Sequence, residues 1–380
     1  MFNHFSLSAR RFALLTSCSL LLASTACQKE SGVSPNPNIA TSTQEAKGSK
    51  EPKNKGKFLS FASRADFLAV AQQLDKMGAG EGTENHLEKW EKKYGFNSLR
   101  AHYAKKQKEK EEREKAAAGV TTLRVPVEGE EPTVPYFEPY EEPWDEGLII
   151  EDDYFAAMLS PEGTVEIEGK IFRIDLANNI VSYIPSTQEA SYDQFVVAQP
   201  TVEGEIRYFS LTEDVFGLLE AGDQGSSFGA DFRGGIRIGS GIGCGPGAGR
   251  KDVKSHQYYA SNRRLDCKLV YQPLGIYHSL VAKAHHQKKT WYGAWLGSPA
   301  NMDIITPGVY WQPLCETYLV SDFGSYTNLY SPWYGDSNGD DNTVTHRYFN
   351  DMKGMKRYKA DVYFRVGQFN TGVFHIESKW

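Results

Sequence analysis

The segment Leu265-Asp266-Cys267-Lys268-Leu269-Val270-Tyr271-Gln272 places an apolar side chain at every second position, beginning with Leu265. Successive side chains of a β-strand point to opposite faces, so this alternation predicts a strand with one face in a core. Further short apolar runs follow, separated by Gly, Pro, Asn and Asp: 276–286, 304–311, 316–320, 360–366 and 371–376. Such spacing, without alternating helices, predicts an antiparallel β-sandwich or barrel rather than a parallel α/β domain.

The segment before residue 120 has a different pattern. Ser63 and Asp66 form a cap-like start, and Phe67, Val70 and Leu74 follow at helical spacing. A second helix is expected from Thr83, and a third leads into the dense Lys/Glu run of residues 105–118, which is typical of a solvated helix. We therefore expect a small helical domain over 58–119.

A linker is expected between the two regions. Residues 125–169 contain no Lys or Arg, and prolines recur among acids and aromatics up to residue 146. Proline disrupts helix interiors, so 120–146 is interpreted as an extended linker. Residues 147–380 then form the β-rich domain, which includes a predicted hairpin over 164–174. The predicted fold class is α+β, with the helical domain followed by the mainly antiparallel domain.

The first residues indicate export. Arg10 and Arg11 precede an apolar run from Phe12 to Ala23, too short to span a membrane, which indicates a signal peptide over 1–26. The residues Ser24-Thr25-Ala26 before Cys27 fit a lipobox, in which the cysteine is acylated. Ordinary cleavage at these small residues is the alternative. Residues 27–57 are polar and are expected to form a disordered tether.

Three short blocks resemble an uncharacterised family of Bacteroidetes-type secreted and surface lipoproteins. The first is Cys27-Gln28-Lys29-Glu30, which is similar to a surface-export signal; the second combines Trp90-Glu91, Gly95-Phe96 and Ser98-Leu99; the third is the hairpin from Glu166 to Ile174. The resemblance implies a lipid anchor at Cys27 and a place on the outer membrane, at the cell surface, with a secreted or periplasmic soluble form as the alternative. The family carries no known activity.

The net charge and the cysteine content limit which partners, disulfides and metal sites the sequence predicts. A net charge of −6 gives no reason to expect a nucleic-acid partner. With Cys27 lipidated, three mature cysteines remain as disulfide candidates: Cys244, Cys267 and Cys315. One bridge and one buried thiol is the simplest arrangement, and the lack of a CxxC pair argues against structural zinc.

Two sets of side chains are candidates for ligand binding. Exposed aromatic rings stack on the apolar faces of sugars, and five aromatics fall near predicted loops or strand ends: Trp291, Tyr292, Trp295, Trp333 and Tyr334. The alternative is that these rings fill the sandwich core. Asp336, Asn338 and Asp340 lie in a predicted loop at the 1-3-5 spacing of a calcium site. Asp341 at position six and Arg347 at position twelve exclude an EF-hand. The two remaining interpretations are a polar turn and a looser structural calcium loop.

Known catalytic motifs are missing from the sequence. GxSxG is absent, the Gly-rich stretch 222–249 contains neither Gly-Lys-Ser/Thr nor GxGxxG, and the cysteines lack a protease context. No catalytic residue or cofactor is assigned. The sequence favours a membrane-anchored, non-catalytic binding protein with a glycan or a cell-envelope protein as partner; a polysaccharide hydrolase with separated carboxylates and a structural surface scaffold remain alternatives.

Overall fold

The computed structural model describes residues 51–77, 83–121, 149–198, 206–223, 225, 232–233, 236–237, 245–290, 293, 295–327 and 342–378. All of them belong to one compact unit, Gly48–Trp380. The predicted signal peptide, Cys27 and most of the predicted linker lie outside the described residues.

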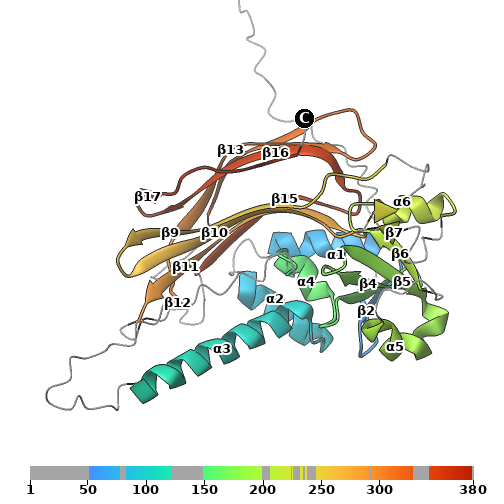
Figure 1. The fold of residues 1–380 in the computed structure, drawn as a ribbon, viewed down its shortest axis with the longest axis horizontal. Helices are drawn as coiled ribbons and strands as arrows, with labels where there is room; N and C mark the ends of the chain where they lie inside the picture. The colour runs from blue at the N-terminus through green and yellow to red at the C-terminus, as the bar shows by residue number, and fades with distance from the viewer. Residues whose placement is uncertain are drawn as a thin grey trace, which may run out of the picture. The chain divides into compact units, whose positions relative to one another are not determined.

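Two antiparallel sheets form the C-terminal half, one lying over the other (Figure 1). The first contains β9 (Lys251–Ala260), β10 (Arg263–Pro273) and β11 (His278–Lys289), and both β12 (Trp295–Gly297) and β15 (Thr343–Asp351) pair with β11. The second contains β14 (Val320–Thr327), β13 (Met302–Pro313) and β16 (Met355–Val366), with β17 (Phe369–Asn370) and β18 (Phe374–Glu377) both paired to β16. The prediction of mainly antiparallel β-structure is confirmed at this level.

The sandwich core follows the alternation seen in the sequence. Leu265, Cys267, Leu269 and Tyr271 of β10 are all buried between the two sheets, where they pack with side chains of β13 and β16. The Tyr271 ring lies 4.6 Å from that of Tyr358, and its hydroxyl accepts a hydrogen bond from the Met355 amide. The opposite face of β10 is therefore the one that presents polar side chains.

A third sheet is mixed and precedes the sandwich in the chain. Its strands, in spatial order, are β1 (Lys53–Asn54), β2 (Leu59–Phe61), β3 (Thr164–Ile167), β4 (Lys170–Asp175), β5 (Ile180–Pro185) and β6 (Arg207–Ser210). Strands β2 and β3 are parallel, and the other neighbours are antiparallel. The hairpin expected over 164–174 is found as β3–β4.

Short elements complete the chain. They are α4 (Asp153–Met158), the 3₁₀ turn η1 (Ser186–Ser191), α5 (Tyr192–Val197), α6 (Val215–Glu220) and the ribbon β7 (Phe232–Arg233) with β8 (Ile236–Arg237). The strand expected over 316–320 is not found there, since β14 begins only at Val320.

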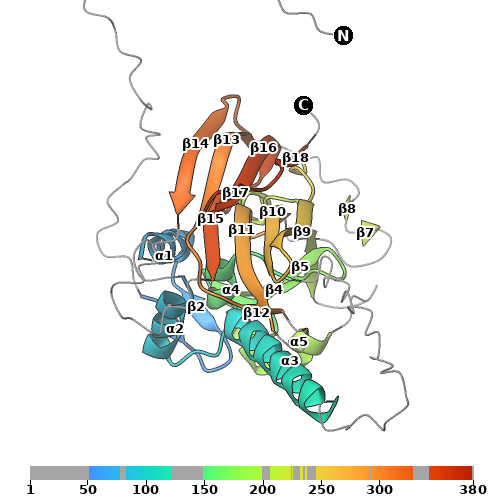
Figure 2. The same cartoon turned by 90° about the vertical axis from the view of Figure 1, so that its left-hand side faces the viewer.

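The N-terminal helices are α1 (Arg64–Met77), α2 (Thr83–Tyr94) and α3 (Leu99–Thr121). All three contact α4, and α1 also contacts β2 whereas α2 contacts β15 (Figure 2). Ser63 caps α1, because its hydroxyl accepts a hydrogen bond from the Asp66 amide. His86 of α2 is buried. Among the described helices, none is long and apolar enough to cross a membrane.

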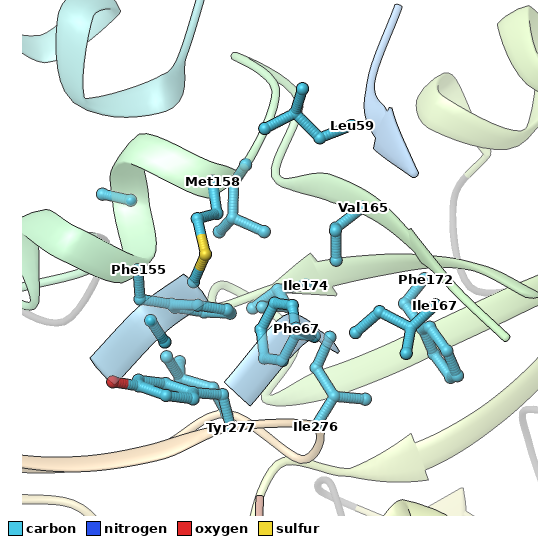
Figure 3. Close-up of a cluster of buried hydrophobic side chains, with 14 of the residues drawn as sticks. Leu59, Phe67, Phe155, Met158, Val165, Ile167, Phe172, Ile174, Ile276 and Tyr277 are labelled. Carbon is cyan, nitrogen blue, oxygen red and sulfur yellow. The ribbon is translucent and has the colours of Figure 1, made fainter. Parts of the chain in front are cut away.

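A separate helical domain is not confirmed, because these helices share one core with the mixed sheet and with the β10–β11 connection at the end of the sandwich. Phe67 of α1 lies edge-on to Phe61 of β2 and to Phe155 of α4, and Phe155 stacks on Tyr277 at 4.4 Å (Figure 3). Tyr277 belongs to the β10–β11 connection. The chain from Gly48 onward is accordingly one packed unit.

A buried ion pair crosses this shared core. The side chains of Arg347 on β15 and Asp152 before α4 are both fully buried, with 3.4 Å between Nη1 and Oδ2. Arg347 also donates to the Tyr277 hydroxyl and to the Ala71 carbonyl of α1, each at 2.8 Å. One guanidinium on β15 thus joins α1, the segment before α4 and the β10–β11 connection.

Candidate functional site

The outer face of the first sandwich sheet carries three rows of polar side chains in register. Each row runs across β9, β10 and β11: Lys254–Lys268–Lys283, then His256–Asp266–His285, then Tyr258–Arg264–Gln287. Residues two apart in a strand share a face, so the three rows form one continuous surface.

The lysine row holds the segment that leads into α4. Glu151 lies 3.2 Å from both Lys254 and Lys268, and Asp153 lies 2.6 Å from Lys283. Burial alone would raise the pKa of Glu151, but Lys268, Lys254 and Lys283 outweigh it and hold that pKa below its usual value. This end of the face therefore serves packing.

The middle row is a polar network in which Asp266 is buried and the two histidines are half-buried. His256 Nδ1 lies 2.5 Å from Asp266 Oδ1, and the same carboxylate contacts Arg264 Nε at 3.1 Å. Burial lowers the pKa of His285 to about 4, so this imidazole is neutral near pH 7. Within the described ranges, no group of three His, Cys, Asp or Glu side chains is placed to hold a metal ion.

The third row ends in an aromatic and cationic cluster, which we call the Trp295 cluster: Tyr258, Arg264, Gln287, Lys289 and Trp295. Trp295 pairs with Lys289 in the β11–β12 ladder. Its ring lies 5.6 Å from that of Tyr258, 4.7 Å from the guanidinium of Arg264 and 5.8 Å from Lys289 Nζ. The cluster sits at the end of the sheet away from α6 (Figure 1).

Local interactions orient this cluster. Arg264 Nε donates to Gln287 Oε1 at 2.7 Å, which fixes the plane of the guanidinium beside the Trp295 ring. Tyr258 remains 57% exposed and Lys289 is also exposed, so solvent reaches the cluster. An exposed Tyr258 next to a half-buried Trp295 can contact the apolar face of a ligand, while the neighbouring amide and guanidinium groups hydrogen-bond the ligand's polar rim.

The structure describes only part of the residues that the sequence predicts to bind a ligand or calcium. Trp295 is described and is in the cluster, whereas seven candidates lie outside the described residues: Trp291, Tyr292, Trp333, Tyr334, Asp336, Asn338 and Asp340. The glycan and calcium hypotheses for those seven stay predictions.

The cysteine candidates are described in part. Cys267 is a free, buried thiol, and Cys315 is disulfide-bonded. Cys244 lies outside the described residues. A bridge and a buried thiol were both expected from the cysteine count.

Four members of the Trp295 cluster were not predicted: Tyr258, Arg264, Gln287 and Lys289. Their contacts are cross-strand, and the register of β9, β10 and β11 is needed to see them. The available signal was period-2 alternation in 251–260, which would have placed Tyr258 on a strand face.

Comparisons with known proteins assign neither a family nor a function to this chain. No family model matches the chain, and no curated protein matches it. One solved structure that is similar is that of a DUF4848 family protein from Bacteroides thetaiotaomicron, at 10% identity over 86% of this chain and 100% of that chain, with a TM-score of 0.19. That score is too low to carry a fold or a function across.

Proposed function

We propose that this chain is a non-catalytic binding protein of the cell envelope, and that the Trp295 cluster binds a glycan. The observation that carries the proposal is the pair of the exposed Tyr258 and the half-buried Trp295, with the Arg264 guanidinium held over the Trp295 ring. Sugar rings have apolar C–H faces that stack on aromatic rings, and their hydroxyls bind amide and guanidinium groups. The cluster supplies both kinds of contact within one strand-end surface.

The carboxylates on the same face support binding over hydrolysis. A glycosidase needs two carboxyl groups on either side of the scissile bond, free to exchange protons. Glu151, Asp153 and Asp266 are each paired with one or more cationic side chains. Carboxylates held in this way act as structural anchors, which favours a binding surface.

Affinity electrophoresis of the purified full chain through gels containing neutral and acidic polysaccharides tests the proposal. We expect retardation without released sugar, and Trp295→Ala to weaken it about tenfold, the equivalent of ~1.4 kcal/mol of lost stacking. Tyr318→Ala is the matched control, because Tyr318 is 51% exposed and lies outside the cluster. Equal retardation of Trp295→Ala and wild type would refute the site, and sugar release would point to a hydrolase.

The envelope location is proposed from the sequence. It is supported by the signal-peptide pattern and by Cys27 after Ser24-Thr25-Ala26. Fatty-acid labelling of cells should mark the wild-type chain and not Cys27→Ser, and added protease should degrade it on intact cells. A labelled Cys27→Ser chain would contradict acylation at this residue.

A further inference from the structure

We infer that the glycan is anionic and that the Trp295 cluster recognises its carboxylate groups, as in polymers of uronic acids. This inference rests on the proposed glycan binding. It comes from the hydrogen-bonding state of Arg264 and from an unbalanced positive charge around Trp295.

Some N–H donors of Arg264 have no hydrogen-bond partner among the described residues. A guanidinium has five N–H donors, and three are directed to partners in the described part of the chain. The contact of Nε with Gln287 is short, at 2.7 Å, whereas Nη1 to Tyr258 and Nη2 to Asp266 are both long, at 3.4 Å. The Nη edge is thus oriented but weakly engaged, and this edge binds carboxylates with two parallel hydrogen bonds.

The strand ends around the cluster carry cations without matching acids. Arg263 of β10 lies directly opposite Lys288 of β11, on the sheet face opposite to Arg264. Like charges at directly opposed positions destabilise a sheet. Lys289 follows on the outer face and contacts Trp295. Within the described residues, no ion pair joins Arg263, Lys288 or Lys289 to an acid.

Asp266 is the acid that contacts this end of the sheet, and it is shared between Arg264 and His256. On the outer face this one carboxylate serves Arg264, while Lys289 beside Trp295 has no ion pair with an acid within the described residues; Arg263 and Lys288 lie on the opposite face. A polyanion lying on the outer face at this strand end would neutralise Lys289 and the Nη edge of Arg264. The stacking pair Tyr258–Trp295 adds the affinity for sugar rings that distinguishes such a ligand from a simple anion.

The test compares matched polymers that differ only in charge. Polygalacturonate, alginate and hyaluronan are each paired with their methyl esters, which keep the sugar rings and remove the negative charge. We expect the full chain to bind at least one acid form about tenfold more tightly than its ester at low salt, and the difference to shrink at ~0.5 M NaCl, where the Debye length is only a few ångströms.

Variants separate this inference from the proposed function. Lys289→Gln should lower the affinity for the acid form about threefold or more relative to its effect on the ester, whereas Trp295→Ala should weaken binding of both forms by the same factor. Lys251→Gln, an exposed lysine at the start of β9, should change neither. Equal binding of acid and ester would overturn the anionic inference and leave glycan binding standing; no binding of any polymer would overturn both.

Discussion

Replacing Arg347 by Met should destabilise the fold by about 3–5 kcal/mol, the cost of removing one partner of a buried ion pair. The Asp152 carboxylate would stay fully buried with the Tyr277 hydroxyl and the Tyr154 and Phe155 amides as partners. The Ala71 carbonyl would lose its donor. Arg347 also lies 4.3 Å from the Tyr154 ring, a cation–π contact that Met cannot reproduce.

A second substitution, at Asp152, removes the buried negative charge that Arg347→Met leaves without its cation. Asp152→Asn keeps an oxygen to accept from the Tyr154 and Phe155 amides, so α4 keeps its cap. The double variant Asp152→Asn/Arg347→Met leaves no buried charge at this position. We expect it to be about 1–3 kcal/mol more stable than the sum of the two single changes predicts, as coupled neighbours are.

Urea unfolding followed by tryptophan fluorescence and circular dichroism measures these differences, provided that the urea slope is unchanged. Arg365→Met is the control, because the Arg365–Asp303 pair is closer, at 2.6 Å, but the Arg365 side chain is 43% exposed. Exposed pairs contribute ~0–1 kcal/mol. A loss below about 1 kcal/mol for Arg347→Met, or strict additivity in the double variant, would refute the view that this pair joins the helices to the sandwich.

Three further outcomes follow from buried groups. Burial lowers the pKa of His278 to about 3, so between pH ~6.5 and ~3 this residue is protonated in the unfolded chain and neutral in the native chain. The free energy of unfolding should therefore fall with falling pH in this window, by up to ~1.4 kcal/mol per pH unit. Urea titrations at several pH values should show a shallower pH dependence for His278→Gln. Gly275 has φ +75°, and a Cβ there would lie 2.6 Å from Val181 Cγ1, so Gly275→Ala should cost about 2–4 kcal/mol in the same assay, and a neutral result would contradict this geometry. Burial raises the pKa of the Cys267 thiol, so mass spectrometry should find Cys267 unmodified by iodoacetamide in the native protein and modified in urea; native labelling at the unfolded rate would place this thiol at the surface.

The parts of the fold that could be predicted are those set by local pattern. The alternation in β10, the hairpin β3–β4 and the Ser63 cap all depend on residues within a dozen positions, where side-chain period and turn chemistry act directly. The expected helical domain is not confirmed, because the apolar faces of α1 and α2 indicate that these helices are buried but do not indicate which elements cover them. Phe67 meets Tyr277 across more than two hundred positions of sequence.

The sequence indicated that aromatic side chains could bind a ligand, but it did not indicate which other residues lie next to them. Trp295 was one of the candidate aromatics, while Arg264 and Tyr258 were indistinguishable from ordinary surface residues of β-strands. Only the register that sets Arg264 opposite Tyr258 and Gln287 makes them neighbours. Cross-strand register depends on turn geometry and core packing together, which no single segment specifies.

The shared core also constrains how the protein is made. Leu59 and Phe67 are buried by residues as distant as Tyr277 and Met352. A ribosome adds ~5–20 residues per second, so Met352 is synthesised tens of seconds after Leu59. During that interval the first helices have no complete surface to bury against, and they must remain bound by a chaperone or exposed. Truncation near the C-terminus should thus cause aggregation that begins with the N-terminal segment.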